Sequence, residues 1–297
     1  MENQSDILRR AKLLFAHRYV KTLARAAGLV LVLLSIGYVV FETVEQWNNL
    51  KQWRPTGLFL LCVAAGALLY ALCGFLLAAA WRNLLPNLDK EPGQDRKLVH
   101  IYARSQITKY IPGNVAQVAY RHVMAHKLVG DHALLAKSAA LEIASLSLAG
   151  LLVGAIAWFP GVLWQVLLFT IAALAALFIA WRAVAYVPSV SAFAGAVLLH
   201  SVFFVVVGFI LIGLLYAVQF PDLPQVWLQV VGVLAFSWIA GMLTPGSPSG
   251  VGIREALIVS LLGSAYEAEL LVAVLAFRVV TILGDVCFFG LRGRKQA

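Results

Sequence analysis

Charged residues are scarce in this 297-residue chain. Asp, Glu, Lys and Arg together make up 12% of it, whereas hydrophobic residues make up 62%, and the mean hydropathy is +0.87. A soluble domain of this length has too little interior to bury that much apolar surface. The composition therefore excludes a soluble protein and predicts an integral membrane protein.

Cysteine and the signatures of common enzymes are also scarce or absent. Cys62, Cys73 and Cys287 lie in apolar segments without the paired spacing of a disulfide or metal framework, so we interpret them as packing residues. No P-loop string occurs, which excludes ATP hydrolysis through a Walker A site. The G-S-P-S-G string at 246–250 has proline at its centre and is not a nucleophile elbow. We expect no metal, no cofactor and no enzymatic activity.

Long apolar runs are the dominant feature that is present. A helix needs roughly 20 such residues to cross about 30 Å of hydrocarbon. The first run is too long for a removable signal peptide, and no good small-residue cleavage site follows it, so we expect it to remain as a span. The sequence thus predicts an all-α polytopic membrane protein with one integral membrane domain, 1–297. Its six predicted full spans lie near 26–44, 57–80, 132–157, 164–181, 190–218 and 270–291.

The basic residues predict the orientation of these spans. The net charge is +9, but the 23 Lys and Arg residues are sorted by side of the membrane, which argues against a nucleic-acid partner. All but Lys51, Arg54, Arg254 and Arg278 fall in segments expected on one side. Because that side is typically cytoplasmic, both termini are expected to face the cytoplasm, in a multi-pass protein of the cytoplasmic membrane. The expected cytoplasmic segments include the basic N-terminus, 1–25, and the loop 81–97.

Two Pro-Gly breaks interrupt the remaining apolar segments, 98–127 and 226–264. The strings are Y-I-P-G-N at 110–114 and T-P-G-S-P-S-G-V-G-I-R-E at 244–255. A backbone broken at membrane depth leaves N–H and C=O groups unsatisfied, so it persists only inside protein or beside a water-filled cavity. We therefore predict two re-entrant hairpins, the first entering from the cytoplasm and the second from the outside.

These hairpins predict an inverted repeat. Span, span, hairpin and span follow one another in a first half, near 20–158, and again from the opposite face in a second half, near 159–297. Many transporters with this layout place their substrate site at mid-membrane. The symmetry prediction rests on topology and on the matched breaks, because we find no convincing identity between the halves.

The first break carries residues suited to a helix N-terminus. Asn114 is a good N-cap, and Gln117 three residues later makes a variant of the capping box. Gln117 and Arg121 then share a face at i, i+4. This pattern predicts that the helix starts at the break and presents an amide and a guanidinium side by side.

The second break adds conformational freedom and charge. Gly250 and Gly252 allow the backbone to approach a ligand closely, and Arg254 and Glu255 lie in the first turn of the helix that follows. Helix N-termini beside arginines favour phosphate or carboxylate, so the predicted ligand is an anionic headgroup. The alternative is that the breaks are ordinary kinks or turns and that the arginines snorkel to the membrane surface.

Two charged residues fall near the middle of predicted spans, where burial is expensive. Glu142 lies in the third span and Arg278 in the sixth. The expected partners are Arg121 for Glu142 and Glu255 for Arg278. These pairs are either part of the site or buried ion pairs without a role in transport.

Two further polar residues are candidates for proton coupling. Asp285 lies two turns past Arg278, and His200 lies in the fifth predicted span. Both could carry protons if transport is coupled to a gradient. The alternative for His200 is a hydrogen bond that packs two helices.

Several of these strings together resemble a known family. The Y-I-P-G-N…Q…R segment, the glutamate in Leu141-Glu142-Ile143, the T-P-G-S-P-S-G-V-G-I-R-E-A segment and the arginine in Phe277-Arg278-Val279 resemble the lysylphosphatidylglycerol synthase/flippase transmembrane family, over roughly 20–292. The resemblance implies a membrane domain similar to a lipid flippase that moves aminoacylated phosphatidylglycerol outward. The family's separate cytosolic aminoacyltransferase domain has no counterpart before Ala297, so synthase activity is not expected.

The first break departs from the family pattern. Many relatives resemble P-G-R-x-G-E-x-x-R there, whereas Asn114 and Gln117 replace the basic and acidic members. The identity of the substrate therefore stays open.

Two functional hypotheses follow. The first is a flippase or scramblase that moves an anionic phospholipid or a polyprenyl-phosphate-linked lipid, with membrane lipids as its partners. The alternative is a membrane-embedded transferase, or an accessory subunit of an envelope glycosyltransferase or lipid-modifying enzyme, with Glu142 or Glu255 as general base. A purely structural membrane partner is a third reading, which the buried charges disfavour. The residues expected to bind the headgroup are Lys109, Pro112, Gly113, Asn114, Gln117, Arg121, Glu142, Pro245, Gly246, Ser249, Gly250, Gly252, Arg254, Glu255 and Arg278.

Overall fold

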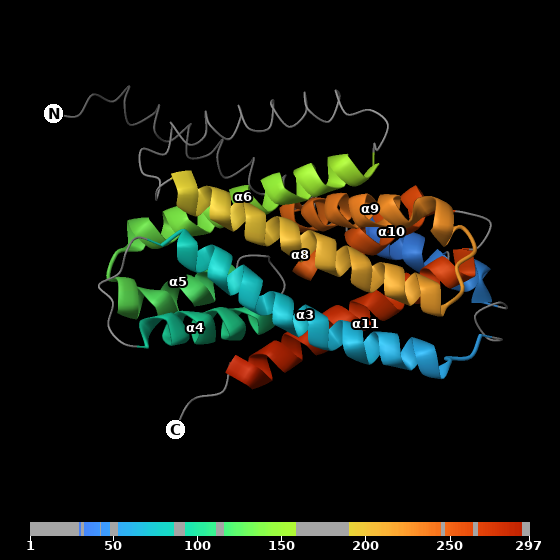
Figure 1. Ribbon diagram of the computed structural model, residues 1–297, viewed down its shortest axis with the longest axis horizontal. Helices are drawn as coiled ribbons and strands as arrows, with labels where there is room; N and C mark the ends of the chain where they lie inside the picture. Colours follow the sequence, from blue (N-terminus) through green and yellow to red (C-terminus); the bar gives the residue numbers. More distant parts are fainter. Residues whose placement is uncertain are drawn as a thin grey trace, which may run out of the picture.

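The regular elements of the protein are helices throughout the part of the chain that the structure describes (Figure 1). This computed structural model describes residues 30, 33–41, 43–47, 53–85, 93–110, 116–158, 190–244, 247–263 and 267–292. The described residues of 30–47 are almost all helical. The elements that follow are α3 (Gly57–Asn83), α4 (Gln94–Thr108), α5 (Ala116–Val129), α6 (His132–Trp158), α8 (Val190–Ala217), α9 (Leu223–Leu243), the 3₁₀ turn η1 (Pro248–Gly250), α10 (Ile253–Leu262) and α11 (Glu267–Arg292).

Five helices, α3, α6, α8, α9 and α11, are long and apolar enough to cross a membrane. The prediction of an all-α, multi-pass membrane protein is therefore confirmed. Four of these helices coincide with the predicted spans 57–80, 132–157, 190–218 and 270–291. The predicted span 164–181 lies outside the described residues, and 26–44 lies only partly within them.

The fifth of these helices, α9, falls where the sequence predicts the first arm of a hairpin. It has 21 residues, whereas the corresponding arm of the first hairpin, α4, has 15. The apolar run before the second break is uninterrupted from Val226 to Leu243 except for a few uncharged polar residues, so the helix continues over a length that can cross the membrane alone. That the second hairpin is re-entrant stays a prediction.

The outer faces of the long helices are apolar. Leu61 of α3 is 64% exposed and Leu198 of α8 is 65% exposed, and both belong to rows of exposed aliphatic side chains. A surface of this kind would aggregate in water and is suited to contact with lipid chains. The interior is equally apolar, with Phe203, Phe204 and Leu234 almost fully buried in one large cluster.

The two halves of the chain have matching elements. Gly57 and Val190, the first residues of α3 and α8, are 133 residues apart, and so are Val129 and Leu262, the last residues of α5 and α10. The remaining helices, α4 and α6, fall close to α9 and α11 under the same shift. The described helices of the two halves therefore follow one another in the same order and at nearly the same spacing along the chain.

The packing also repeats between the halves. The corresponding helices are α3 and α8, α4 and α9, α5 and α10, and α6 and α11. In the first half, α3 and α4 pack on α11, and α5 packs on α6. In the second half, α8 and α9 pack on α6, and α10 packs on α11. The contact between α3 and α8 joins the halves, and Figure 1 shows these two helices running in opposite directions. Tyr70 and Phe203, again 133 residues apart, meet there edge to face with ring centroids 6.3 Å apart. Among the described helices, the packing within one half thus resembles the packing within the other.

The contact between α6 and α9 depends on small residues. A Cβ added to Gly150 would lie 2.5 Å from Ile239 Cδ1 and 2.9 Å from Phe204 Cε2, and one added to Gly154 would lie 2.7 Å from Phe236 Cε1. Small residues at this spacing let two helix backbones approach closely within a membrane.

We expect Gly150→Ala to destabilise the protein by about 1–3 kcal/mol, because overpacking forces Ile239 and Phe204 out of place. The measurement is the apparent Tm of the purified protein in detergent. Gly213→Ala in α8 is the matched control, because a Cβ at Gly213 meets nothing within 4 Å while the gain in helix propensity is the same. Equal Tm values for the two variants would contradict the close packing.

Candidate functional site

The first charged cluster joins α4, α5 and α6. Arg121 and Glu142, which are 3% and 7% exposed, form a two-armed ion pair in which Nη1 donates to Oε1 at 2.9 Å and Nη2 contacts Oε2. The Tyr102 hydroxyl donates to the same Oε1 at 2.9 Å, and the guanidinium lies over the rings of Trp81 and Tyr102. Both charges are therefore matched by charge-assisted hydrogen bonds.

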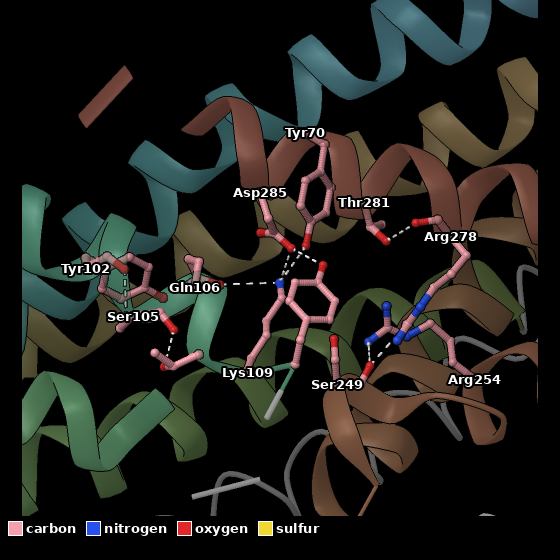
Figure 2. A network of polar contacts seen from close by, with 12 residues as sticks. Tyr70, Tyr102, Ser105, Gln106, Lys109, Ser249, Arg254, Arg278, Thr281 and Asp285 are labelled. Atoms are coloured by element: carbon pink, nitrogen blue, oxygen red, sulfur yellow. Dashed lines mark hydrogen bonds and ion pairs between the residues drawn. The ribbon is translucent and has the colours of Figure 1, made fainter. Parts of the chain in front are cut away.

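The second charged cluster lies at the other break, between α10 and α11. Arg278 Nη1 lies 3.4 Å from Glu255 Oε1, and Glu255 Oε2 accepts the backbone N–H of Gly252 at 2.7 Å, which caps α10. Arg278 Nη1 and Arg254 Nη2 both donate to the backbone carbonyl of Ser249, at 3.1 and 3.3 Å. Figure 2 shows the two guanidinium groups converging on this oxygen. The two arginines thus share one carbonyl, and Arg278 is also paired with a carboxylate.

The backbone of the second break is tightly turned. Gly250 has φ +70° and packs against α9, where a Cβ on Gly250 would lie 3.2 Å from Gly241 Cα. Ser249 has φ +53°, a conformation that L-residues rarely adopt. Because only glycine fits against Gly241 at this angle, Gly250 sets the turn in which the Ser249 carbonyl accepts from both arginines.

A third cluster connects the two halves, from the end of α4 to α11 (Figure 2). Lys109 Nζ lies 2.7 Å from Asp285 Oδ2, and the Tyr110 hydroxyl donates to the same oxygen at 2.5 Å. The ammonium also lies 3.4 Å from Gln106 Oε1 and 3.5 Å from the Tyr70 hydroxyl. Burial lowers the pKa of Lys109 below its usual range, and Asp285 opposes this shift. The Lys109 ammonium is therefore held by three polar neighbours, Asp285, Gln106 and Tyr70.

A cavity of about 180 Å³ lies between these clusters, lined by helices of both halves. Three of its lining side chains have a buried polar atom without a hydrogen-bond partner among the described residues: Gln106 Nε2, His200 Nε2 and Arg254 Nε. Arg254 also stacks on Trp238, with Cζ 3.6 Å from the ring centroid. Buried polar atoms of this kind take water or a ligand as partner. Burial and the nearby Arg278 lower the pKa of Arg254 to about 10, so it stays charged at neutral pH.

Both ion pairs expected from the sequence are present, Arg121 with Glu142 and Arg278 with Glu255. All the predicted site residues fall into three groups. Those that line the cavity are Lys109, Gln117, Arg121, Glu142, Ser249, Gly250, Arg254 and His200. Those that lie behind the lining and contact it or one another are Gly252, Glu255, Arg278 and Asp285. Those that lie outside the described residues are Pro112, Gly113, Asn114, Pro245 and Gly246.

The two candidates for proton coupling have structural partners. His200 Nδ1 lies 3.1 Å from Ser145 Oγ, a contact between α8 and α6, which matches the helix-packing alternative for this histidine. Asp285 is engaged by Lys109 and Tyr110. Proton coupling through either residue stays a prediction.

On the polar face of α4, sequence reasoning identified Lys109 but missed Tyr102 and Gln106. Tyr102, Gln106 and Lys109 follow one another at spacings of four and three residues, so all three lie on one side of the helix and line the cavity. Tyr70 and Trp238 were missed as well, because aromatic residues in apolar helices look like packing residues. The spacing on α4 was the signal that could have revealed the face.

A repeated string was also missed. Pro-Gly-x₄-Val-x₂-Arg occurs at 112–121 and again at 245–254, at the same separation of 133 residues that relates the helices. The string places Arg121 and Arg254 at equivalent positions of the two halves. The match is short and embedded in dissimilar apolar sequence, so it stands out only when the spacing of the helices is known.

No protein-family model matches this chain, and no curated protein is similar to it in sequence. The resemblance to the lysylphosphatidylglycerol synthase/flippase transmembrane family therefore rests on the motifs alone and stays a prediction. What the fold and the site define is a multi-pass helical membrane protein with a charged cavity between two similar halves.

We expect Glu142→Gln to destabilise the protein by about 3–5 kcal/mol, because it leaves the Arg121 guanidinium buried without a matching charge. The double variant Arg121→Gln/Glu142→Gln should recover much of this loss. Asp95→Asn is the matched control, because its ion pair with Arg82 is exposed and worth at most about 1 kcal/mol. The measurement is the unfolding midpoint in detergent, and a double variant no more stable than Glu142→Gln would contradict the explanation.

Proposed function

We propose that this protein is a flippase-like or scramblase-like lipid transporter. It moves an anionic phospholipid or a polyprenyl-phosphate-linked lipid between leaflets, with the headgroup in the cavity and the lipid chains in the bilayer. The observation that carries the proposal is the cavity itself, which lies between the two halves and contains the equivalent arginines Arg121 and Arg254. The Nε–H of Arg254 has no partner among the described residues and is a donor suited to a phosphate oxygen.

The repeated packing supports a transporter. Helices of the two halves run in opposite directions where α3 meets α8, as expected of an inverted repeat across a membrane. In this proposal the hairpins α4–α5 and α9–α10 carry the breaks to mid-membrane, where the substrate sites of such proteins lie. In this proposal both termini face the cytoplasm, an orientation that the distribution of Lys and Arg favours.

We favour transport over the transferase alternative because of the state of the carboxylates. A general base needs a carboxylate that is free to accept a proton from the acceptor. Glu142 is held by Arg121 and Tyr102, and Glu255 is held by Arg278 and the N–H of Gly252. Each of these two glutamates would have to lose its partner before it could accept a proton as a general base.

Leaflet exchange in liposomes tests the proposal. We expect the purified protein to accelerate exchange of labelled phosphatidylglycerol, or of a labelled polyprenyl phosphate, above the rate in protein-free liposomes. Arg254→Gln should slow this exchange by at least about tenfold, because a charge-assisted hydrogen bond contributes about 1.5–3 kcal/mol. Each lipid is measured with and without an imposed proton gradient.

The matched control is Arg96→Gln, which removes the same charge from an exposed position on α4. It should exchange lipid at the original rate, and the Tm of both variants should show that they are folded. If neither lipid moves faster than in protein-free liposomes under any of these conditions, lipid transport is ruled out for these headgroups.

A further inference from the structure

The carboxylates around the cavity are all engaged by cations. Glu142 is paired with Arg121, Asp285 with Lys109, and Glu255 with Arg278. Each carboxylate also accepts a further hydrogen bond, from Tyr102, from Tyr110 and from the Gly252 N–H. A cationic headgroup would have to displace one of these partners and leave a buried cation unmatched, which is costly.

The site has a surplus of positive charge. Four cations, Lys109, Arg121, Arg254 and Arg278, face the three carboxylates of these ion pairs. The surplus is centred on Arg254, which has no carboxylate within ion-pair distance among the described residues and instead contacts a carbonyl and the face of Trp238. A ligand with a single negative charge would balance the site.

The remaining unpartnered groups of the cavity are neutral hydrogen-bonding groups. Gln106 Nε2 and His200 Nε2 belong to lining residues of different halves, and neither atom has a partner among the described residues. An amide and an imidazole are suited to hydroxyl or carbonyl oxygens. The volume of about 180 Å³ far exceeds the roughly 10–15 Å³ that one water needs, so a small polyol or a sugar can enter.

From these observations we infer a headgroup selectivity, which rests on the proposed function: the site takes a phosphate diester that carries an uncharged, hydroxyl-rich substituent and rejects one that carries an ammonium group. The phosphate binds at Arg254, and the hydroxyl groups bind at Gln106 and His200. A glycerol phosphate and a sugar phosphate share this chemistry. Aminoacylated phosphatidylglycerol, the lipid implied by the family resemblance, does not.

Competition binding tests the selectivity. The full chain in nanodiscs of phosphatidylcholine is loaded with a fluorescent phosphatidylglycerol, which is then displaced by unlabelled phosphatidylglycerol, lysylphosphatidylglycerol or a polyprenyl phosphohexose. We expect phosphatidylglycerol or the phosphohexose to displace the probe at a concentration at least about tenfold lower than lysylphosphatidylglycerol does. The better of these two identifies the source of the headgroup.

A charge variant makes the test specific to the site. Gln106→Glu adds a second carboxylate, besides Glu142, to the lining of the cavity, so it should shift the preference toward lysylphosphatidylglycerol by at least about threefold. Gln106→Met adds no charge. It should weaken the binding of both phosphatidylglycerol and lysylphosphatidylglycerol without changing the preference between them.

The outcomes separate the two proposals. If lysylphosphatidylglycerol displaces the probe as well as phosphatidylglycerol or better, the selectivity is wrong while lipid binding stands. If Gln106→Glu leaves the preference unchanged, the selectivity does not come from the charge of this cavity. If neither this probe nor a fluorescent polyprenyl phosphohexose binds specifically, the proposed function itself fails.

Discussion

The neutralisation of buried charge is the constraint on which the rest of the structure depends. Each hairpin carries charged groups into an apolar bundle, and each is joined to a long helix by an ion pair: Arg121 of α5 to α6, Lys109 beyond α4 to α11, and Glu255 of α10 to α11. Because an unpaired ion in such surroundings is expensive, these bonds fix where the interrupted segments lie. Residues of both interrupted segments line the cavity.

The features that the sequence reveals are those with an unambiguous chemical signal. Glu142 and Arg278 are isolated charges in apolar runs, so their need for partners could be predicted, and the four long spans follow from length and hydropathy. The pair of Lys109 and Asp285 could not be foreseen, because either residue could serve another role and nothing in the sequence shows that α4 ends beside α11. The sequence predicted a hairpin over 226–264 without setting the length of its first helix, α9, which has 21 residues.

The site breaks the symmetry of the packing. Arg121 and Arg254 occupy equivalent positions, yet Arg121 is paired with a carboxylate from the last helix of its half, whereas the last helix of the other half contributes Arg278. In the first half the hairpin supplies the cation of the ion pair and the last helix supplies the carboxylate. In the second half these roles are reversed, because Glu255 supplies the carboxylate from the hairpin. Arg254 is left over from this reversal, and that explains why the surplus charge lies on one side of the cavity only.

This combination of similar packing and dissimilar chemistry bears on the proposed transport. When two halves pack alike, exchanging their conformations preserves most helix contacts, so the two arrangements differ little in energy outside the site. The residues whose contacts differ between the halves then decide the energy difference between the two arrangements. Arg254 is such a residue, and it is charged and has no carboxylate partner in the described part of the chain. An anionic headgroup bound there changes the energies of the two arrangements unequally, which is what a ligand must do to shift a conformational equilibrium.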